Sequence, residues 1–197
     1  MVATEGVDRR ATILAAAGEL FAAKGVSATS VREIAQEVGI LSGSLYHHFG
    51  SKDDLVQEIV LSYLEDLGES YDAILERDLA PIDAIEALVR ASLETVQRHP
   101  FATEIYQNDA AYLKRLPRGD EIAAAGERVP ETWLRVIRDG VAAGDLREDI
   151  PARIFYNMLR DALWRCVQWF DPTRGHDWEQ LGNDFLAIFL EGFATRR

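Results

Sequence analysis

Apolar residues recur every three or four positions along almost the whole chain, which is the spacing of amphipathic helices. The first such segment covers about residues 8–24, and Gly25 follows it where a left-handed residue commonly ends a helix. No segment shows the strict alternation of apolar and polar residues that is typical of strands. The pattern therefore predicts an all-α protein of about nine helices.

Two short helices are predicted after the first one, with a tight turn at Gly39 between them. Ser30 and Glu33 have the spacing of a capping box, which would start the first of these short helices. The second spans roughly residues 43–48. Two short helices that are joined by a glycine turn and packed on a longer preceding helix are typical of a helix-turn-helix.

A long helix is predicted from Lys52 to about Arg77, with Ser51 as its N-cap and two aspartates in its first turn. The remaining helical segments are about 81–98, 101–114, 119–142 with a break or kink near Val129-Pro130, 151–170 and 177–194. We therefore predict two domains, a three-helix DNA-binding domain over residues 1–52 and a helical effector-binding and dimerisation domain over residues 53–197.

The formal net charge of −12 at first argues against a nucleic-acid partner. The distribution of charge along the chain changes this interpretation. Residues 1–52 hold five basic and five acidic side chains, so the whole acidic excess lies in the rest of the chain. A DNA-binding surface needs only local positive charge, and an acidic body that points away from DNA is compatible with it.

Composition excludes several other classes of protein. The single cysteine, Cys166, can form neither an internal disulfide nor a zinc site built on several thiolates, which fits a reducing cytosol and predicts a cytoplasmic protein. No signal-peptide pattern is visible, and no apolar stretch approaches the roughly 20 residues of a membrane span. The motifs of common hydrolases, metalloproteases and nucleotide-binding enzymes are absent, so we expect neither catalysis nor a bound metal or cofactor.

The second short helix has the composition expected of a helix that reads DNA. Small residues at its start, Ser42, Gly43 and Ser44, would let it approach base edges. Leu45 and Phe49 are expected to anchor it inward. The candidates near its outer face, where hydroxyl and imidazole N–H groups donate to phosphates, are Tyr46, His47 and His48.

Further candidates for DNA contact flank this helix. Lys52 and Thr29 lie at helix N-termini, where exposed N–H groups favour phosphate. Arg32 is long enough to reach a base edge, and guanine is its best partner. A metal site at His47 and His48 is disfavoured, because adjacent helical residues point about 100° apart. The alternative for the two histidines is a solvated or packed pair. The alternative for the two short helices is a helical bundle that binds nothing.

Residues 29–55, TSVREIAQEVGILSGSLYHHFGSKDDL, resemble the N-terminal signature of the TetR family of repressors. The preceding helix also ends in the family's F-x-x-K-G, here residues 21–25, so the likeness covers about 50 residues. The resemblance implies DNA binding, with a phosphate contact by Thr29. The residues that it implies face DNA are Arg32, Ser42, Ser44, Tyr46, His47, His48 and Lys52.

The predicted body carries all four tryptophans, and polar groups interrupt its apolar helix faces. Arg160 and Trp164 are four residues apart and therefore share a helix face. Together they could form a cationic, aromatic-walled slot for an anionic, partly apolar ligand. An aspartate-paired surface arginine and a tryptophan packed in the core are the structural alternatives.

Scattered blocks over most of the chain resemble a TetR subgroup that represses the late, ring-degrading steps of cholesterol catabolism. These blocks are GILSGSLYHHF at 39–49, IYQ at 105–107, RDALW at 160–164 and WFDP at 169–172. The resemblance implies that the effector is the coenzyme A thioester of a steroid-derived fragment. It also implies that Arg160 and Trp164 lie near the coenzyme A part, with Tyr106 and Gln107 as further pocket residues.

The last two predicted helices are expected to build a homodimer, which would read a near-palindromic operator in double-stranded DNA. An apolar stripe on the last helix is either core or interface, and consists of Leu181, Phe185, Ile188, Phe189 and Gly192. We therefore predict a transcriptional repressor that a small effector releases from DNA by changing the spacing of the two heads. The alternatives are a repressor that answers to a fatty acyl-CoA or a lipophilic drug, a DNA-binding protein without effector, and an enzyme.

Overall fold

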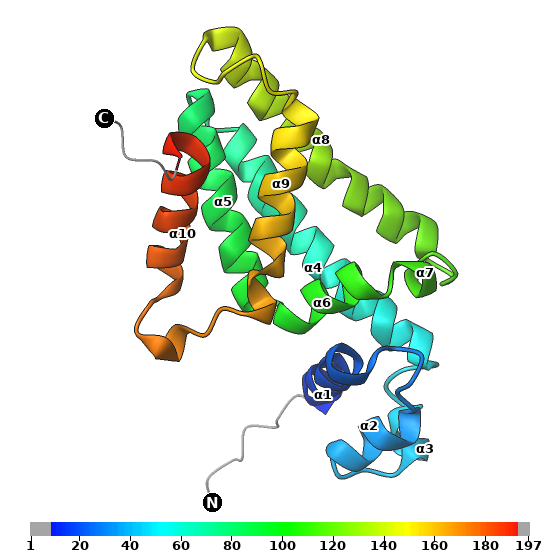
Figure 1. The fold of residues 1–197 in the computed structure, drawn as a ribbon. Coiled ribbons are helices and arrows are strands. Elements are labelled where there is room, and N and C mark those ends of the chain that lie inside the picture. The colour runs from blue at the N-terminus through cyan, green and yellow to red at the C-terminus, as the bar shows by residue number, and fades with distance from the viewer. Residues whose placement is uncertain (1–8, 193–197) are drawn as a thin grey trace, which may run out of the picture. The chain divides into compact units, whose positions relative to one another are not determined.

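A computed structural model describes residues 9–192, and all regular secondary structure in this range is helical (Figure 1). The ten α-helices of this range are α1 (Arg9–Lys24), α2 (Val31–Glu37), α3 (Ser42–Leu45), α4 (Lys52–Leu75), α5 (Pro81–Arg98), α6 (Pro100–Asn108), α7 (Ala110–Leu113), α8 (Gly119–Ala143), α9 (Ala152–Trp164) and α10 (Trp178–Leu186). The 3₁₀ segments η1 (Arg165–Gln168) and η2 (Pro172–Arg174) follow α9, and the π-helical segment η3 (Ala187–Glu191) follows α10. The predicted all-α class is confirmed, with ten α-helices in place of about nine.

Several predicted boundaries differ from the structure. The segment predicted as one helix over 101–114 is interrupted at Asp109, which separates α6 from α7. Near Val129-Pro130, where a break or kink was predicted, there is no break, because α8 continues through Pro130, and a kink stays a prediction. A proline removes one backbone N–H donor, and the rest of this long helix tolerates that loss. The predicted limits at residues 8 and 194 lie outside the described residues.

The chain divides into two compact units. Within the described range, unit 1 holds residues 9–64 and 101–124, and unit 2 holds residues 65–100 and 125–192. Helices α4 and α8 each contribute residues to both units. The boundary predicted at residue 52 separates a DNA-binding domain from an effector-binding domain. This functional division stays a prediction.

Local signals start and end the helices of unit 1 as expected. The Ser30 hydroxyl accepts the Glu33 N–H at 3.2 Å, and the Glu33 carboxylate accepts the Ser30 N–H at 2.8 Å, which completes the capping box. Lys24 at the end of α1 donates to Glu33 at 2.9 Å. This hydrogen bond, together with those from Ser30, lowers the pKa of Glu33 to about 2. Gly25 and Gly39 have φ of 84° and 68°, so the turns around α2 use conformations that other residues rarely adopt.

Unit 2 is built around α5, which packs against both α9 and α10 (Figure 1). A chain of buried polar groups runs through its core. The Ser92 hydroxyl donates to the Leu88 carbonyl at 2.6 Å, so it accepts from the Tyr71 hydroxyl, which lies 2.6 Å away. The Trp133 indole N–H donates to the same Tyr71 oxygen at 2.8 Å. Burial raises the pKa of the Tyr71 phenol above its ordinary value, and the chain ties α4, α5 and α8 together.

Candidate functional site

Helix α3 is one turn long, and two buried side chains hold it. Leu45 is fully buried, and Phe49 after the helix is 3% exposed, as predicted. The guanidinium of Arg10, from α1, lies 4.6 Å from the centroid of the Phe49 ring and covers that ring. The same guanidinium pairs with the Glu58 carboxylate. The short helix therefore has a defined position although it is too short to be stable alone.

The polar candidates in α3 and directly after it are all at least partly accessible. Ser42 and Ser44 are half-buried, whereas His47 and His48 are exposed. Tyr46 has an exposed fraction of 54%, which is high for so large a ring. Arg32, the second residue of α2, is also exposed. This placement is compatible with the predicted DNA contacts, which themselves stay predictions.

Lys52 and Thr29 are placed differently from the other candidates. The Lys52 ammonium donates to the Val26 carbonyl at 2.8 Å and to the Thr29 carbonyl at 3.0 Å. Thr29 is 2% exposed, and its hydroxyl lies 3.0 Å and 3.2 Å from the carbonyl oxygens of Gly25 and Leu20. Both side chains therefore satisfy backbone carbonyls inside unit 1. The structure gives them a positioning role between α1, α2 and α4, and their predicted phosphate contacts stay predictions.

The beginning of α4 is also tied to α7 and to the residue that precedes α8, which sequence reasoning did not anticipate. The Tyr112 hydroxyl donates to the Asp53 carboxylate at 2.5 Å, and the Arg118 N–H donates to the Gln57 side chain at 2.7 Å. Burial and the bond to Asp53 raise the pKa of Tyr112 to about 12. The sequence explained Asp53 by the helix dipole alone. No local pattern marks a partner 59 residues away.

Metal and thiol chemistry find no support in the part of the chain that the structure describes. No group of three or more histidine, cysteine, aspartate or glutamate side chains within residues 9–192 is arranged to hold a metal ion. Cys166 is buried, and burial raises the pKa of its thiol to about 12. A thiol that stays protonated at neutral pH is a poor nucleophile.

The predicted effector residues of α9 lie on one helix face, but with different exposure. Arg160 is exposed, and its guanidinium pairs with the Asp161 carboxylate at 2.7 Å. It also lies 5.9 Å from the centroid of the Tyr156 ring, one turn earlier. Trp164, one turn later, is only 7% exposed. The sequence missed Tyr156 as an aromatic neighbour of Arg160, although its spacing of four residues would have indicated it.

The other two predicted effector residues belong to unit 1. Tyr106 and Gln107 are half-buried on α6, and the Tyr106 ring lies 6.0 Å from that of Tyr63. Arg160 and Trp164 belong to unit 2. Each pair is therefore placed within its own unit, and a pocket shared by all four residues stays a prediction.

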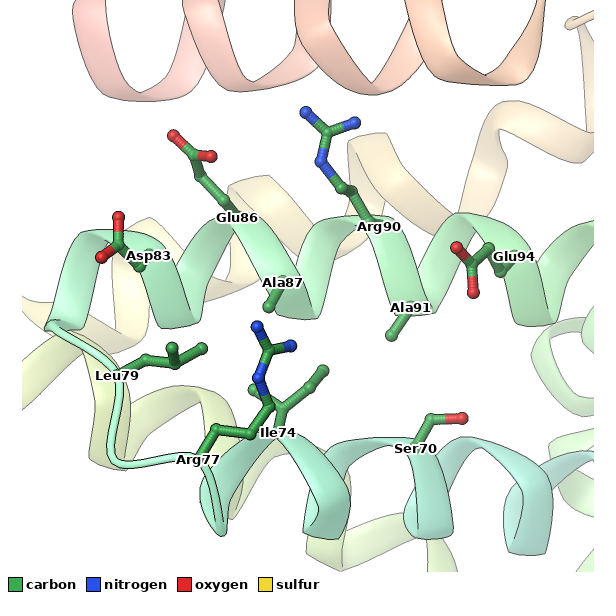
Figure 2. Close-up of a pocket in the computed structure, with 10 residues that line it drawn as sticks. All are labelled: Ser70, Ile74, Arg77, Leu79, Asp83, Glu86, Ala87, Arg90, Ala91 and Glu94. Atoms are coloured by element: carbon green, nitrogen blue, oxygen red, sulfur yellow. The ribbon is translucent and has the colours of Figure 1, made fainter.

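Unit 2 also carries an open groove of about 600 Å³ between the end of α4 and α5, which sequence reasoning did not indicate. Its lining combines two arginines and three carboxylates with small and apolar side chains: Ser70, Ile74, Arg77, Leu79, Asp83, Glu86, Ala87, Arg90, Ala91 and Glu94. Figure 2 shows Ala87 and Ala91 of α5 directed toward α4, while Glu86 and Arg90 point away from it. The mixed charges make the groove a poor match for a strongly anionic ligand, and it contains none of the four predicted effector residues.

Comparison with known proteins decides the family. Residues 13–59 match the model of bacterial regulatory proteins of the tetR family, and residues 78–193 match the tetracyclin repressor-like C-terminal domain. The chain belongs to the TetR family. This TetR protein is 36% identical over 189 residues to the HTH-type transcriptional repressor KstR2 of Mycolicibacterium smegmatis, covering 96% of this chain and 92% of that one. It is 37% identical over 187 residues to KstR2 of Rhodococcus jostii, covering 95% and 92% of the two chains.

Solved structures give the same result. The ketosteroid transcriptional regulator KstR2 of Mycobacterium tuberculosis has a TM-score of 0.88 and 34% identity to this TetR protein, covering 100% of this chain and 98% of that one. A probable transcriptional regulatory protein, RHA5900, has a TM-score of 0.90 and 37% identity, covering 95% and 100%. The chain is thus a TetR-type transcriptional repressor homologous to KstR2. TetR regulators bind DNA operators and are typically dimers.

These relatives are named as repressors and not as enzymes, in agreement with the prediction. Within the described residues, no helix has the length and apolarity that a membrane crossing requires.

Replacing Arg32 with alanine is expected to relax base preference at one base pair of each half-site. A bidentate arginine–guanine contact contributes about 1–3 kcal/mol of discrimination against the wrong base. The wild-type protein is first used to enrich a duplex from a random-sequence pool, and this duplex is called the selected operator. Competition binding is then measured with each base pair of the selected operator varied in turn. Arg135→Ala removes the same charge from an exposed position of α8 and should leave the preference unchanged. An unaltered base preference in Arg32→Ala would refute base reading by Arg32.

Proposed function

We propose that this TetR-type repressor leaves its operator when it binds a coenzyme A thioester derived from steroid breakdown. The observation that carries the proposal is the arrangement on α9, where an exposed arginine lies between two aromatic residues at helical spacing. Among the candidate effectors, a coenzyme A thioester fits this arrangement best, because it is both anionic and partly apolar.

The chemistry of Arg160 suits a phosphate or carboxylate group. A guanidinium presents a planar fork of donors that matches these oxygens, and it keeps its charge at any physiological pH. Its present partner, Asp161, is itself exposed. Exposed ion pairs contribute at most about 1 kcal/mol, so an incoming phosphate can replace Asp161 at little cost. Tyr156 and Trp164 lie on the turns before and after Arg160 with exposed fractions of 3% and 7%, so the guanidinium is the part of this face that a ligand reaches first.

The steroid origin of the effector rests on the relatives. One similar solved protein is named a ketosteroid transcriptional regulator, and the likeness extends over the whole of this chain. Four KstR2 proteins are 36–37% identical to it over nearly its full length. This supports a steroid-derived effector over a fatty acyl-CoA or a lipophilic drug.

We also propose a homodimer through the C-terminal helices. Ile154 and Met158 lie one turn apart on α9 with exposed fractions of 50% and 64%, and Ile188 in η3 is 48% exposed. Exposed apolar side chains on neighbouring turns favour association. Leu181 and Phe185 of the predicted stripe are instead buried within the single chain. As a regulator that acts on the chromosome of a bacterium, the dimer would function in the cytoplasm.

The effector can act only through its different affinity for the DNA-bound and released forms of the dimer. The proposal is tested by calorimetry with free coenzyme A, a long-chain fatty acyl-CoA and the thioester of a bicyclic steroid-derived acid. The steroid thioester is expected to bind most tightly and to weaken operator binding in a gel-shift titration. Arg160→Ala should lower its affinity roughly 10- to 100-fold, as expected when a charged hydrogen bond is lost.

Arg153→Ala is the matched control, because Arg153 is another exposed arginine of α9. It should bind the thioester like the wild-type protein. Tighter binding of the fatty acyl-CoA would overturn the steroid origin. Equal binding by wild-type protein and Arg160→Ala would overturn the site on α9. A thioester that binds but leaves operator affinity unchanged would overturn its role as effector.

A further inference from the structure

Leu41 is the most exposed of the large apolar side chains in the described part of the chain. Its exposed fraction is 80%, whereas the others with high exposure range from 38% to 64%. It directly precedes Ser42 and is the N-cap residue of α3, with φ of −73° and ψ of 143°. No hydrogen bond from its side chain caps the helix. Leu41 thus lies at the start of the helix that carries the predicted DNA-reading residues.

Leucine is an unfavourable residue at this position for the free protein. Serine, threonine, aspartate or asparagine would accept a hydrogen bond from the first turn of α3, which a leucine cannot do. An isolated exposed leucine is common on protein surfaces. Here, however, the exposed apolar surface and the missing cap coincide in one residue. Burial of this side chain against DNA would remove the first disadvantage and offset the second.

We propose that Leu41 contacts the 5-methyl group of a thymine in each operator half-site and thereby helps to set operator sequence. The first residues of a recognition helix approach base edges in the major groove. The thymine methyl is the apolar group that this groove presents, and apolar side chains read it by direct contact. The neighbouring candidates Ser42, Ser44 and Arg32 are polar or charged, so Leu41 supplies the apolar part of the surface. The inference rests on DNA binding by the TetR family and does not depend on the proposed effector.

The test uses the selected operator with each thymine replaced in turn by deoxyuridine, which removes only the 5-methyl group. At one thymine per half-site, the replacement should lower the affinity of the wild-type protein by about fourfold, which is the effect of one buried methyl group. Replacement in both half-sites should give roughly the product of the two effects. Leu41→Ser should bind the thymine and deoxyuridine duplexes equally well, and Leu41→Met should retain the preference for thymine.

Leu41→Ser also separates DNA reading from folding. Serine can cap α3, so the thermal stability of this variant should equal or exceed that of the wild-type protein. Deoxyuridine at the other thymines should affect wild-type protein and Leu41→Ser alike, which provides an internal control. The inference is overturned if no thymine shows a methyl effect that Leu41→Ser abolishes. If the wild-type protein enriched no duplex, DNA binding itself would be overturned, and the inference on Leu41 with it. Absence of a response to the proposed effector would leave DNA binding and the inference on Leu41 intact.

Discussion

Trp133→Ala is expected to lower the free energy of unfolding by about 3–5 kcal/mol, the usual cost of removing a large aromatic side chain from a core. Trp133 is fully buried in unit 2, between the rings of Tyr71 and Tyr156 at centroid distances of 6.3 Å and 6.5 Å. Its removal leaves a cavity and also takes away the N–H that donates to the Tyr71 hydroxyl. Denaturant unfolding followed by circular dichroism measures the change.

Trp169→Ala is the matched control, because this tryptophan is 63% exposed and contacts Phe170 edge to face. It should lower the free energy of unfolding by less than about 1 kcal/mol. Trp133→Phe would separate the two causes, since it fills much of the space but lacks the N–H donor. Equal destabilisation by Trp133→Ala and Trp169→Ala would show that the buried chain from Trp133 to Ser92 does not stabilise unit 2.

Lys52→Met is expected to weaken operator binding while leaving its salt dependence unchanged. The Lys52 ammonium holds two carbonyls of the segment between α1 and α2, at Val26 and Thr29. Methionine keeps much of the side-chain volume but leaves these acceptors without their charged donor, which should cost about 1–3 kcal/mol of stability. The helix-turn-helix would then be held less firmly for DNA, and affinity would fall for all sequences alike.

The alternative for Lys52, a direct phosphate contact, makes a different prediction. Loss of one phosphate contact would lower the salt slope by about 1 without a comparable change in stability. Operator affinity measured over a range of salt concentrations, together with thermal unfolding, distinguishes the two roles. Lys114→Met is the control, because it removes an exposed lysine from the same unit and should change neither stability nor slope. A reduced salt slope with unchanged stability in Lys52→Met would instead support a direct phosphate contact by Lys52.

Lys52 and Thr29 illustrate a limit of motif-based prediction. The motif locates them correctly at helix N-termini, where phosphate contacts are common. It does not say whether each side chain points outward or inward. In the structure, the last turn of α1 and the segment after it present carbonyl oxygens that need donors, and these two side chains supply them. Their position was therefore predictable, but their direction depends on the neighbouring chain segment.

Arg160 and Trp164 show the same limit in the body. Helical periodicity correctly places them on one face of α9. Their exposure differs because Trp164 packs into the core of unit 2 while Arg160 remains at the surface. Each matches the structural alternative that the sequence left open, an aspartate-paired arginine and a packed tryptophan. This arrangement is compatible with the proposed site, since the Arg160–Asp161 pair is exposed.

The sequence by itself determined the helical class, the approximate positions of most helices and the family. Periodicity predicted α5 with its observed bounds, and the capping box at Ser30 together with the glycines at 25 and 39 defined the turns around α2. These features depend on residues within a few positions of one another, so a local pattern is sufficient to specify them. The family signature is likewise a continuous stretch of chain.

Only the tertiary structure decided which side chains meet across the chain and which remain accessible. The bonds from Tyr112 to Asp53 and from Trp133 to Tyr71 join residues 59 and 62 positions apart. The exposure of Leu41 beside the buried Leu45 is likewise set by what packs against α3. Such contacts depend on how distant helices pack together, and helical periodicity carries no information about the partner of a given face.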